Sequence, residues 1–96
     1  MIFHTQQLVD GQPRVVNVEG KAVILKDCPH KFFVYKKGAL WHVIHGDSGW
    51  AVAANTLRKW AVRDAQEKWD TKKDKFEALV KIHTPAFQEL LKEKIQ

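Results

Sequence analysis

A chain of 96 residues is long enough for one domain with one modest core, and its four tryptophans and five phenylalanines can fill that core. The single cysteine, Cys28, excludes an internal disulfide, and no apolar run approaches the roughly 18 residues of a membrane span. The net charge of +5 favours negatively charged partners and argues against a DNA-mimicking inhibitor, which would need a strongly acidic face. We therefore expect one domain over residues 1–96, located in the cytoplasm, with no membrane partner.

The first 54 residues predict β-strands. Short apolar runs are broken by turn residues every eight to twelve positions, which is typical of an antiparallel β-meander. A turn at residues 10–13 follows a first strand over residues 2–9. Glu19-Gly20 fits a two-residue hairpin turn between residues 14–18 and residues 21–25.

A second hairpin is predicted further along the chain. Residues 31–35 and residues 40–44 flank Lys36-Lys37-Gly38, which fits a three-residue loop with Gly38 in the left-handed conformation. Gly46-Asp47-Ser48-Gly49 makes the next turn, and residues 50–53 make the final strand. We therefore predict up to six strands in one antiparallel sheet.

The hydrophobic rhythm becomes helical after Asn55 or Thr56, either of which can cap the first turn. One apolar stripe runs along the helical part, formed by Leu57, Ala61, Ala65, Trp69, Phe76, Leu79, Val80 and His83. A continuous helix over residues 56–83 would be roughly 42 Å long, about twice the length of short strands. It therefore either breaks near Asp70-Thr71, with Thr71 capping a second helix, or projects and pairs with another protein. The polar stretch between Gln66 and Lys75 favours the break.

Thr84-Pro85 is predicted to end one helix and to open the last, whose apolar face is Phe87, Leu90, Leu91 and Ile95. The predicted fold class is α+β: an antiparallel β-meander over residues 1–54, packed by two or three helices over residues 55–96. If Trp69, Phe76 and Leu79 are not covered within the chain, we expect a homodimer through residues 56–83.

Catalytic and metal chemistry find little support. Cys28, His30, His42 and His45 are suitable metal ligands, and the hairpin could bring His30 near His45, but their spacing matches no common zinc pattern. Gly46-Asp47-Ser48-Gly49 superficially matches the nucleophile segment of chymotrypsin-like proteases, yet the chain is too short for the two barrels of that family. We interpret this segment as a turn. We expect no catalytic, metal or cofactor-binding site, and a protein that is not an enzyme.

Basic and aromatic residues alternate in two segments. Such surfaces bind nucleic acid by neutralising phosphates and stacking bases. The candidate binding residues are Lys31, Tyr35, Lys36 and Lys37 on the hairpin, which also carries Trp41, and Arg58, Lys59, Trp60 and Arg63 on the first helical turns. Alternatively, Trp60 covers the sheet edge while charges pair along the helix, as Asp64 with Lys68, Lys73 with Glu77, and Glu77 with Lys81.

Residues 32–69 resemble small accessory proteins of bacteriophages and prophages. The resemblance lies in a Phe-Val-Tyr strand, a Lys-Lys-Gly turn, Trp41-x-Val43-x-His45, a Ser48-Gly49 turn and a helix start of Thr56-x-Arg58-x-x-Ala61. It carries no catalytic residues. It implies a phage-encoded protein in the host cytoplasm that binds and modulates, by inhibition, a host protein or nucleoprotein complex. The alternative is a small basic protein that binds nucleic acid directly.

Overall fold

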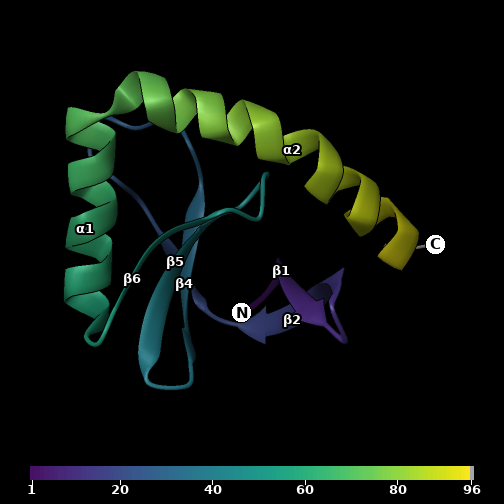
Figure 1. The fold of residues 1–96 in the computed structure, drawn as a ribbon. Helices are drawn as coiled ribbons and strands as arrows, with labels where there is room; N and C mark the ends of the chain where they lie inside the picture. The colour runs from purple at the N-terminus through teal and green to yellow at the C-terminus, as the bar shows by residue number, and fades with distance from the viewer. Residues whose placement is uncertain (96) are drawn as a thin grey trace.

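Six antiparallel strands in two sheets precede two helices in the computed structural model, which describes residues 1–95, the side chain of residue 95 excepted (Figure 1). β1 (Ile2–Val9) and β2 (Gln12–Glu19) form a two-stranded sheet. The second sheet has the order β3 (Lys21–Val23), β4 (Phe32–Lys37), β5 (Leu40–His45) and β6 (Ala51–Asn55). The helices are α1 (Arg58–Thr71) and α2 (Lys73–Ile95). The predicted α+β class is confirmed, whereas the prediction of one sheet is wrong.

The chain changes sheets at Gly20, where we predicted a hairpin turn. β2 pairs with β1 as far as Ile2 opposite Glu19, and β3 pairs with β4 instead of β2. Gly20 is not among the residues with positive φ, which a two-residue hairpin turn requires, and its N–H donates to the Met1 carbonyl. A Cβ atom there would lie 2.7 Å from the Val34 carbonyl oxygen, so the crossing needs glycine.

The β4–β5 hairpin has a shorter loop than predicted. Lys37 pairs with Leu40, which leaves Gly38 and Ala39 as a two-residue loop, with Gly38 at φ +61°. The first position of such a loop requires a positive φ, and glycine adopts it without steric cost. The hairpin itself is confirmed.

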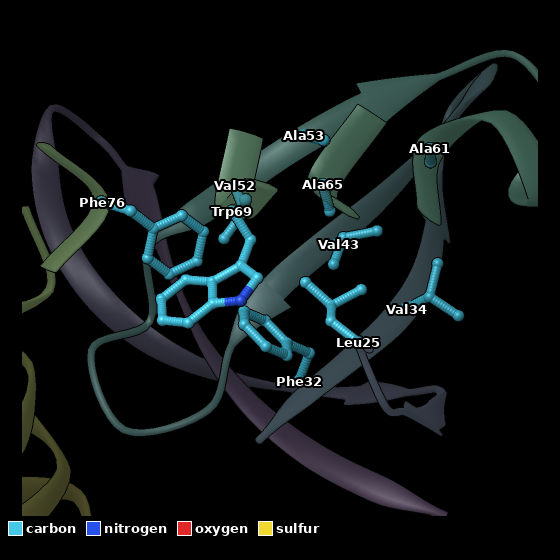
Figure 2. Close-up of a cluster of buried hydrophobic side chains, with 10 residues drawn as sticks. All are labelled: Leu25, Phe32, Val34, Val43, Val52, Ala53, Ala61, Ala65, Trp69 and Phe76. Atoms are coloured by element: carbon cyan, nitrogen blue, oxygen red, sulfur yellow. The ribbon is translucent and has the colours of Figure 1, made fainter. Parts of the chain in front are cut away.

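One face of the four-stranded sheet packs against the helices (Figure 2). Phe32 and Val34 of β4 lie in this core with Ala61 and Ala65 of α1, both of which are fully buried. The small alanine side chains allow α1 to lie close to the sheet. Near the end of α1, the Trp69 ring meets the Phe76 ring edge to face, with centroids 5.3 Å apart.

Trp69 and Phe76 are 6% and 2% exposed, and Leu79 is half-buried. Two of the three side chains on which the predicted homodimer depended are therefore covered within the chain. The homodimer through residues 56–83 stays a prediction, but exposed Trp69 and Phe76 side chains no longer support it.

The opposite face of the same sheet is covered by the β1–β2 hairpin. Phe33, Tyr35 and Ile44 form a second buried cluster, against which Phe3 and Val18 pack. The Phe3 and Phe33 rings stack with centroids 4.5 Å apart and planes 9° apart. β4 is thus buried on both of its faces.

The predicted break between helices is confirmed, and it lies at Lys72, whose φ of −139° and ψ of 43° are not helical. The predicted capping role of Thr71 is wrong, because its hydroxyl donates to the Glu67 carbonyl at 2.8 Å, one turn back in α1. The break turns the chain sharply, so that α2 passes over the end of the sheet toward β2 (Figure 1).

The prediction that a helix ends at Thr84-Pro85 is wrong, because α2 continues through both residues. Proline lacks the N–H that would bond to the Lys81 carbonyl, and such a position bends a helix. α2 follows a curved path in Figure 1, and Phe87, two residues after Pro85, is 1% exposed. Tertiary packing of the last turns thus outweighs the local cost of Pro85.

Candidate binding surface

Trp41 of β5 connects the two segments that carry the candidate binding residues. Lys36, its neighbour across the β4–β5 hairpin, has Nζ 6.0 Å from the Trp41 ring centroid. The Arg58 guanidinium at the start of α1 lies 5.9 Å from the same ring. Both distances are in the range of cation–π attraction. The fold therefore joins the hairpin to the first turn of α1 through a residue that we had not included among the candidates.

Trp60 forms a second cluster of the same kind. Its side chain is 40% exposed, and Lys59 Nζ and Arg63 Cζ each lie 6.0 Å from its ring centroid. We call the combined set the basic-aromatic surface: Lys36, Lys37, Trp41, Arg58, Lys59, Trp60 and Arg63. It occupies the hairpin end of the molecule and the adjacent start of α1, at the lower left of Figure 1.

Two of the predicted residues lie elsewhere. Tyr35 is 6% exposed, accepts a hydrogen bond from Gln7 at 3.3 Å and stacks on His42, so its position does not support a surface role. Lys31 is exposed but precedes β4 at the end opposite to the hairpin loop, where its carbonyl accepts the Gly46 N–H. Lys37 is exposed beside the loop.

Few acidic groups neutralise this surface. Glu19 pairs with the amino group of Met1 and with no lysine or arginine of this surface. Arg63 lies 3.4 Å from Asp64, whose pKa is lowered chiefly by a hydrogen bond from Asn55. Asn55 therefore holds Asp64 and does not cap α1, which begins after Leu57 with no side-chain cap.

The charge pairs that we considered along the helices do not form within residues 1–95. Lys68 Nζ donates instead to the Val52 carbonyl at 2.5 Å, and Glu77 bonds to His30. Lys36, Arg58 and Lys59 likewise have no carboxylate within 4.0 Å in this part of the chain. Their charges are available to a partner.

A separate polar network links the sheet to α2. The Trp50 N–H donates to Ser48 Oγ, and the Ser48 N–H donates to His45 Nδ1. Because His45 Nδ1 is an acceptor, Ser48 Oγ–H donates to it as well, at 2.8 Å. His45 Nε2–H then donates to His30 Nδ1 at 3.0 Å, and His30 Nε2–H donates to Glu77 Oε1 at 2.5 Å. The predicted proximity of His30 to His45 is confirmed, while Glu77 was not foreseen.

This network has the residue types of a nucleophile, a base and an orienting carboxylate, but its hydroxyl is enclosed. Ser48 is 2% exposed and His45 is 1% exposed. A nucleophile must reach its substrate, so Ser48 in this position fastens the turn and does not present a reactive oxygen. Residues 46–48 do form the predicted turn.

The network predicts how stability responds to pH. Burial, and secondly the neighbouring His30, lower the pKa of His45 below its ordinary 6.5, against weaker opposing effects of Asp47 and Glu77. Between the folded and unfolded pKa values the unfolded chain binds more protons, so the free energy of unfolding rises with pH there. This stabilisation is complete above about pH 6.5 and is lost as the pH falls through the lower pKa of the folded state.

Urea unfolding at pH 7.5, 6.0 and 5.0 checks this expectation. His45→Gln should flatten the decline in the free energy of unfolding, whereas His83→Gln, which changes an exposed histidine of α2, should leave it unchanged. Equal slopes for the wild type and His45→Gln would contradict the assignment.

Two further groups have shifted pKa values. Burial raises the pKa of the Cys28 thiol, which disfavours the reactive thiolate at neutral pH. Burial and the nearby Lys37 lower the pKa of His42. No three His, Cys, Asp or Glu side chains among residues 1–95 are grouped so that they could hold a metal ion.

Neither helix, over the part of the chain that the structure describes, is long and apolar enough to cross a membrane.

Comparisons of the chain with protein-family models, with curated proteins and with solved structures each found no match.

Proposed function

We propose that this protein is a non-enzymatic binding protein that inhibits a host protein or nucleoprotein complex, and that it contacts its partner through the basic-aromatic surface. The observation that carries the proposal is the exposed Trp60 ring with Lys59 and Arg63 within 6.0 Å of it, together with the Lys36–Trp41–Arg58 cluster at the start of the same helix. Exposed tryptophan and arginine side chains are the residues that most often dominate binding energy at interfaces. The phage setting and the inhibitory role rest on the resemblance of residues 32–69 alone.

The chemistry of this surface also supports the alternative, direct binding of nucleic acid. Cations without carboxylate partners attract phosphates, and an exposed indole ring can stack on a base. Four cations of the basic-aromatic surface lie within about 6 Å of a tryptophan ring. A nucleotide at either tryptophan can therefore stack its base on the ring and place its phosphate beside a cation. In either proposal the partner presents a negatively charged face.

A triple variant, Lys59→Ala, Trp60→Ala and Arg63→Ala, tests direct binding. If the protein binds nucleic acid, its affinity for single-stranded DNA and RNA should fall steeply with salt in a fluorescence anisotropy titration. The variant should bind at least about tenfold more weakly, because it loses two phosphate contacts and one stacking platform. Its slope of log K against log salt should be shallower by about 1.4, since each phosphate contact on a single strand contributes about 0.7.

The matched control is Lys81→Ala, Ile82→Ala and Lys92→Ala, which removes two exposed cations and one exposed apolar side chain from α2. It should bind nucleic acid like the wild type. Equal losses in both variants would contradict a localised surface.

Capture from a bacterial lysate treated with nuclease separates the two proposals. A stable protein complex that the first triple variant fails to recover, together with no binding to nucleic acid at low salt, supports the host-complex proposal. Both proposals would be contradicted if the wild type and the first triple variant recovered the same proteins and the wild type bound no nucleic acid.

A further inference from the structure

The junction of α1 and α2 holds a surface pocket of about 250 Å³ that shares no lining residue with the basic-aromatic surface. Five of its lining residues fall within residues 68–79, which span the corner between α1 and α2 seen in Figure 1. Its lining combines three cations with three large apolar side chains: Trp50, Lys68, Lys72, Lys75, Phe76 and Leu79. Along α1, Lys68 at the edge of the pocket lies eight residues, or about 12 Å, after Trp60.

The lysines of this pocket form no ion pair in the part of the chain that the structure describes. Lys68, Lys72 and Lys75 have no carboxylate within 4.0 Å among residues 1–95. The hydrogen bond from Lys68 Nζ to the Val52 carbonyl fixes one ammonium group at the pocket, while Lys72 and Lys75 are exposed and adjustable. Like charges that line one pocket repel one another, and a bound anion reduces that repulsion.

The rest of the lining suits a flat apolar group. Trp50 is half-buried, and its ring meets the ring of Phe76 edge to face, with centroids 5.0 Å apart. Leu79, also half-buried, completes this side of the pocket. A volume of about 250 Å³ lies slightly below the roughly 300–1,000 Å³ that is usual for drug-sized ligands, so the ligand must be small.

We propose that this junction pocket binds a phosphate monoester carried on an aromatic base, either as a free nucleotide or as the terminal nucleotide of a strand. The base lies against Trp50 and Leu79, and the phosphate is held by Lys72 and Lys75. Ammonium groups bind phosphate as point charges, and the indole ring supplies a stacking contact that tolerates any base. This inference does not depend on the proposed function, because it uses none of the residues of the basic-aromatic surface.

The test is a titration of ¹⁵N-labelled protein with adenosine monophosphate, adenosine and inorganic phosphate, followed by NMR. We expect the Trp50 indole resonance and the backbone of residues 68–79 to shift with adenosine monophosphate. Adenosine and phosphate alone should each bind at least about tenfold more weakly, since each makes only part of the contacts. Equal affinity for adenosine and adenosine monophosphate, or shifts confined to residues 58–63, would overturn the proposal.

Two double variants complete the design. Lys72→Ala with Lys75→Ala should weaken adenosine monophosphate binding by about tenfold or more, and both changes are at exposed positions, so the fold should survive. Lys59→Ala with Arg63→Ala, which impairs the basic-aromatic surface, should leave this binding unchanged. Equal affinity of the Lys72/Lys75 variant and the wild type would refute the site even if the proposed function holds.

The source of the nucleotide is decided by short thymidine oligonucleotides with a 5′-phosphate or a 5′-hydroxyl. A strand end is the ligand if only the phosphorylated oligonucleotide shifts the Trp50 indole and the Lys72/Lys75 variant loses that shift. Free nucleotide is the ligand if adenosine monophosphate alone does so. Absence of both responses at millimolar ligand would end the proposal.

Discussion

Replacement of Phe76 by alanine is expected to lower the free energy of unfolding by about 3–5 kcal/mol, a large part of the roughly 5–15 kcal/mol typical of a domain. The ring is 2% exposed and lies 5.3 Å from the Trp69 ring and 5.0 Å from the Trp50 ring, centroid to centroid. It thus packs α2 against α1 and against the residue that precedes β6. Urea unfolding followed by circular dichroism measures the loss as a lower midpoint at unchanged slope.

The matched control is Ile82→Ala on the same helix, where the side chain is 68% exposed. This change should alter the free energy of unfolding by no more than about 0.5 kcal/mol. If the two variants were equally stable, α2 would not be docked through Phe76, and the description of the core would be wrong.

The helical face of α1 could be predicted from the sequence because it depends on local spacing. Ala61, Ala65 and Trp69 recur at intervals of four and are all buried, and the break after Thr71 falls where that spacing fails. The same locality explains the cluster around Trp60, because Arg63 follows Trp60 by three residues and Lys59 by four on one helix.

Strand pairing could not be predicted with the same success, because it depends on residues far apart in the sequence. The two strands next to Gly20, β2 and β3, do not pair with each other. β2 pairs with β1, and β3 pairs with β4. Tyr35 illustrates the consequence for the site. A strand covered on both faces, as β4 is, has no alternation that shows which ring is exposed.

The polar network shows the same limit. The proximity of His30 to His45 follows from the hairpin, whereas Glu77 lies 47 residues after His30 and meets it only because α2 turns back at Lys72. Pro85 is the opposite case: its local preference is clear, but the burial of Phe87 overrides it. Tertiary packing decides both outcomes.

Replacement of Gly49 by alanine is expected to destabilise the protein by about 2–4 kcal/mol, because two costs act together. Gly49 has φ +66°, a conformation that strains any residue with a Cβ atom. The added Cβ would also lie 2.5 Å from Cδ1 of Phe87, a side chain that is 1% exposed and cannot move away into solvent. Urea unfolding at pH 7.5 measures the sum.

Two further variants separate the strain from the collision. Gly11→Ala is the matched control, since Gly11 has φ +79° but no atom within 4 Å of the added Cβ, so only the strain of about 1–2 kcal/mol applies. In a Phe87→Leu background, which lacks the ring, the cost of Gly49→Ala should fall toward that of Gly11→Ala. The difference is the coupling free energy between the turn and α2. If Gly49→Ala costs no more than Gly11→Ala in the wild-type background, α2 is not seated on this turn, and the path of the helix beyond Pro85 would have to be redrawn.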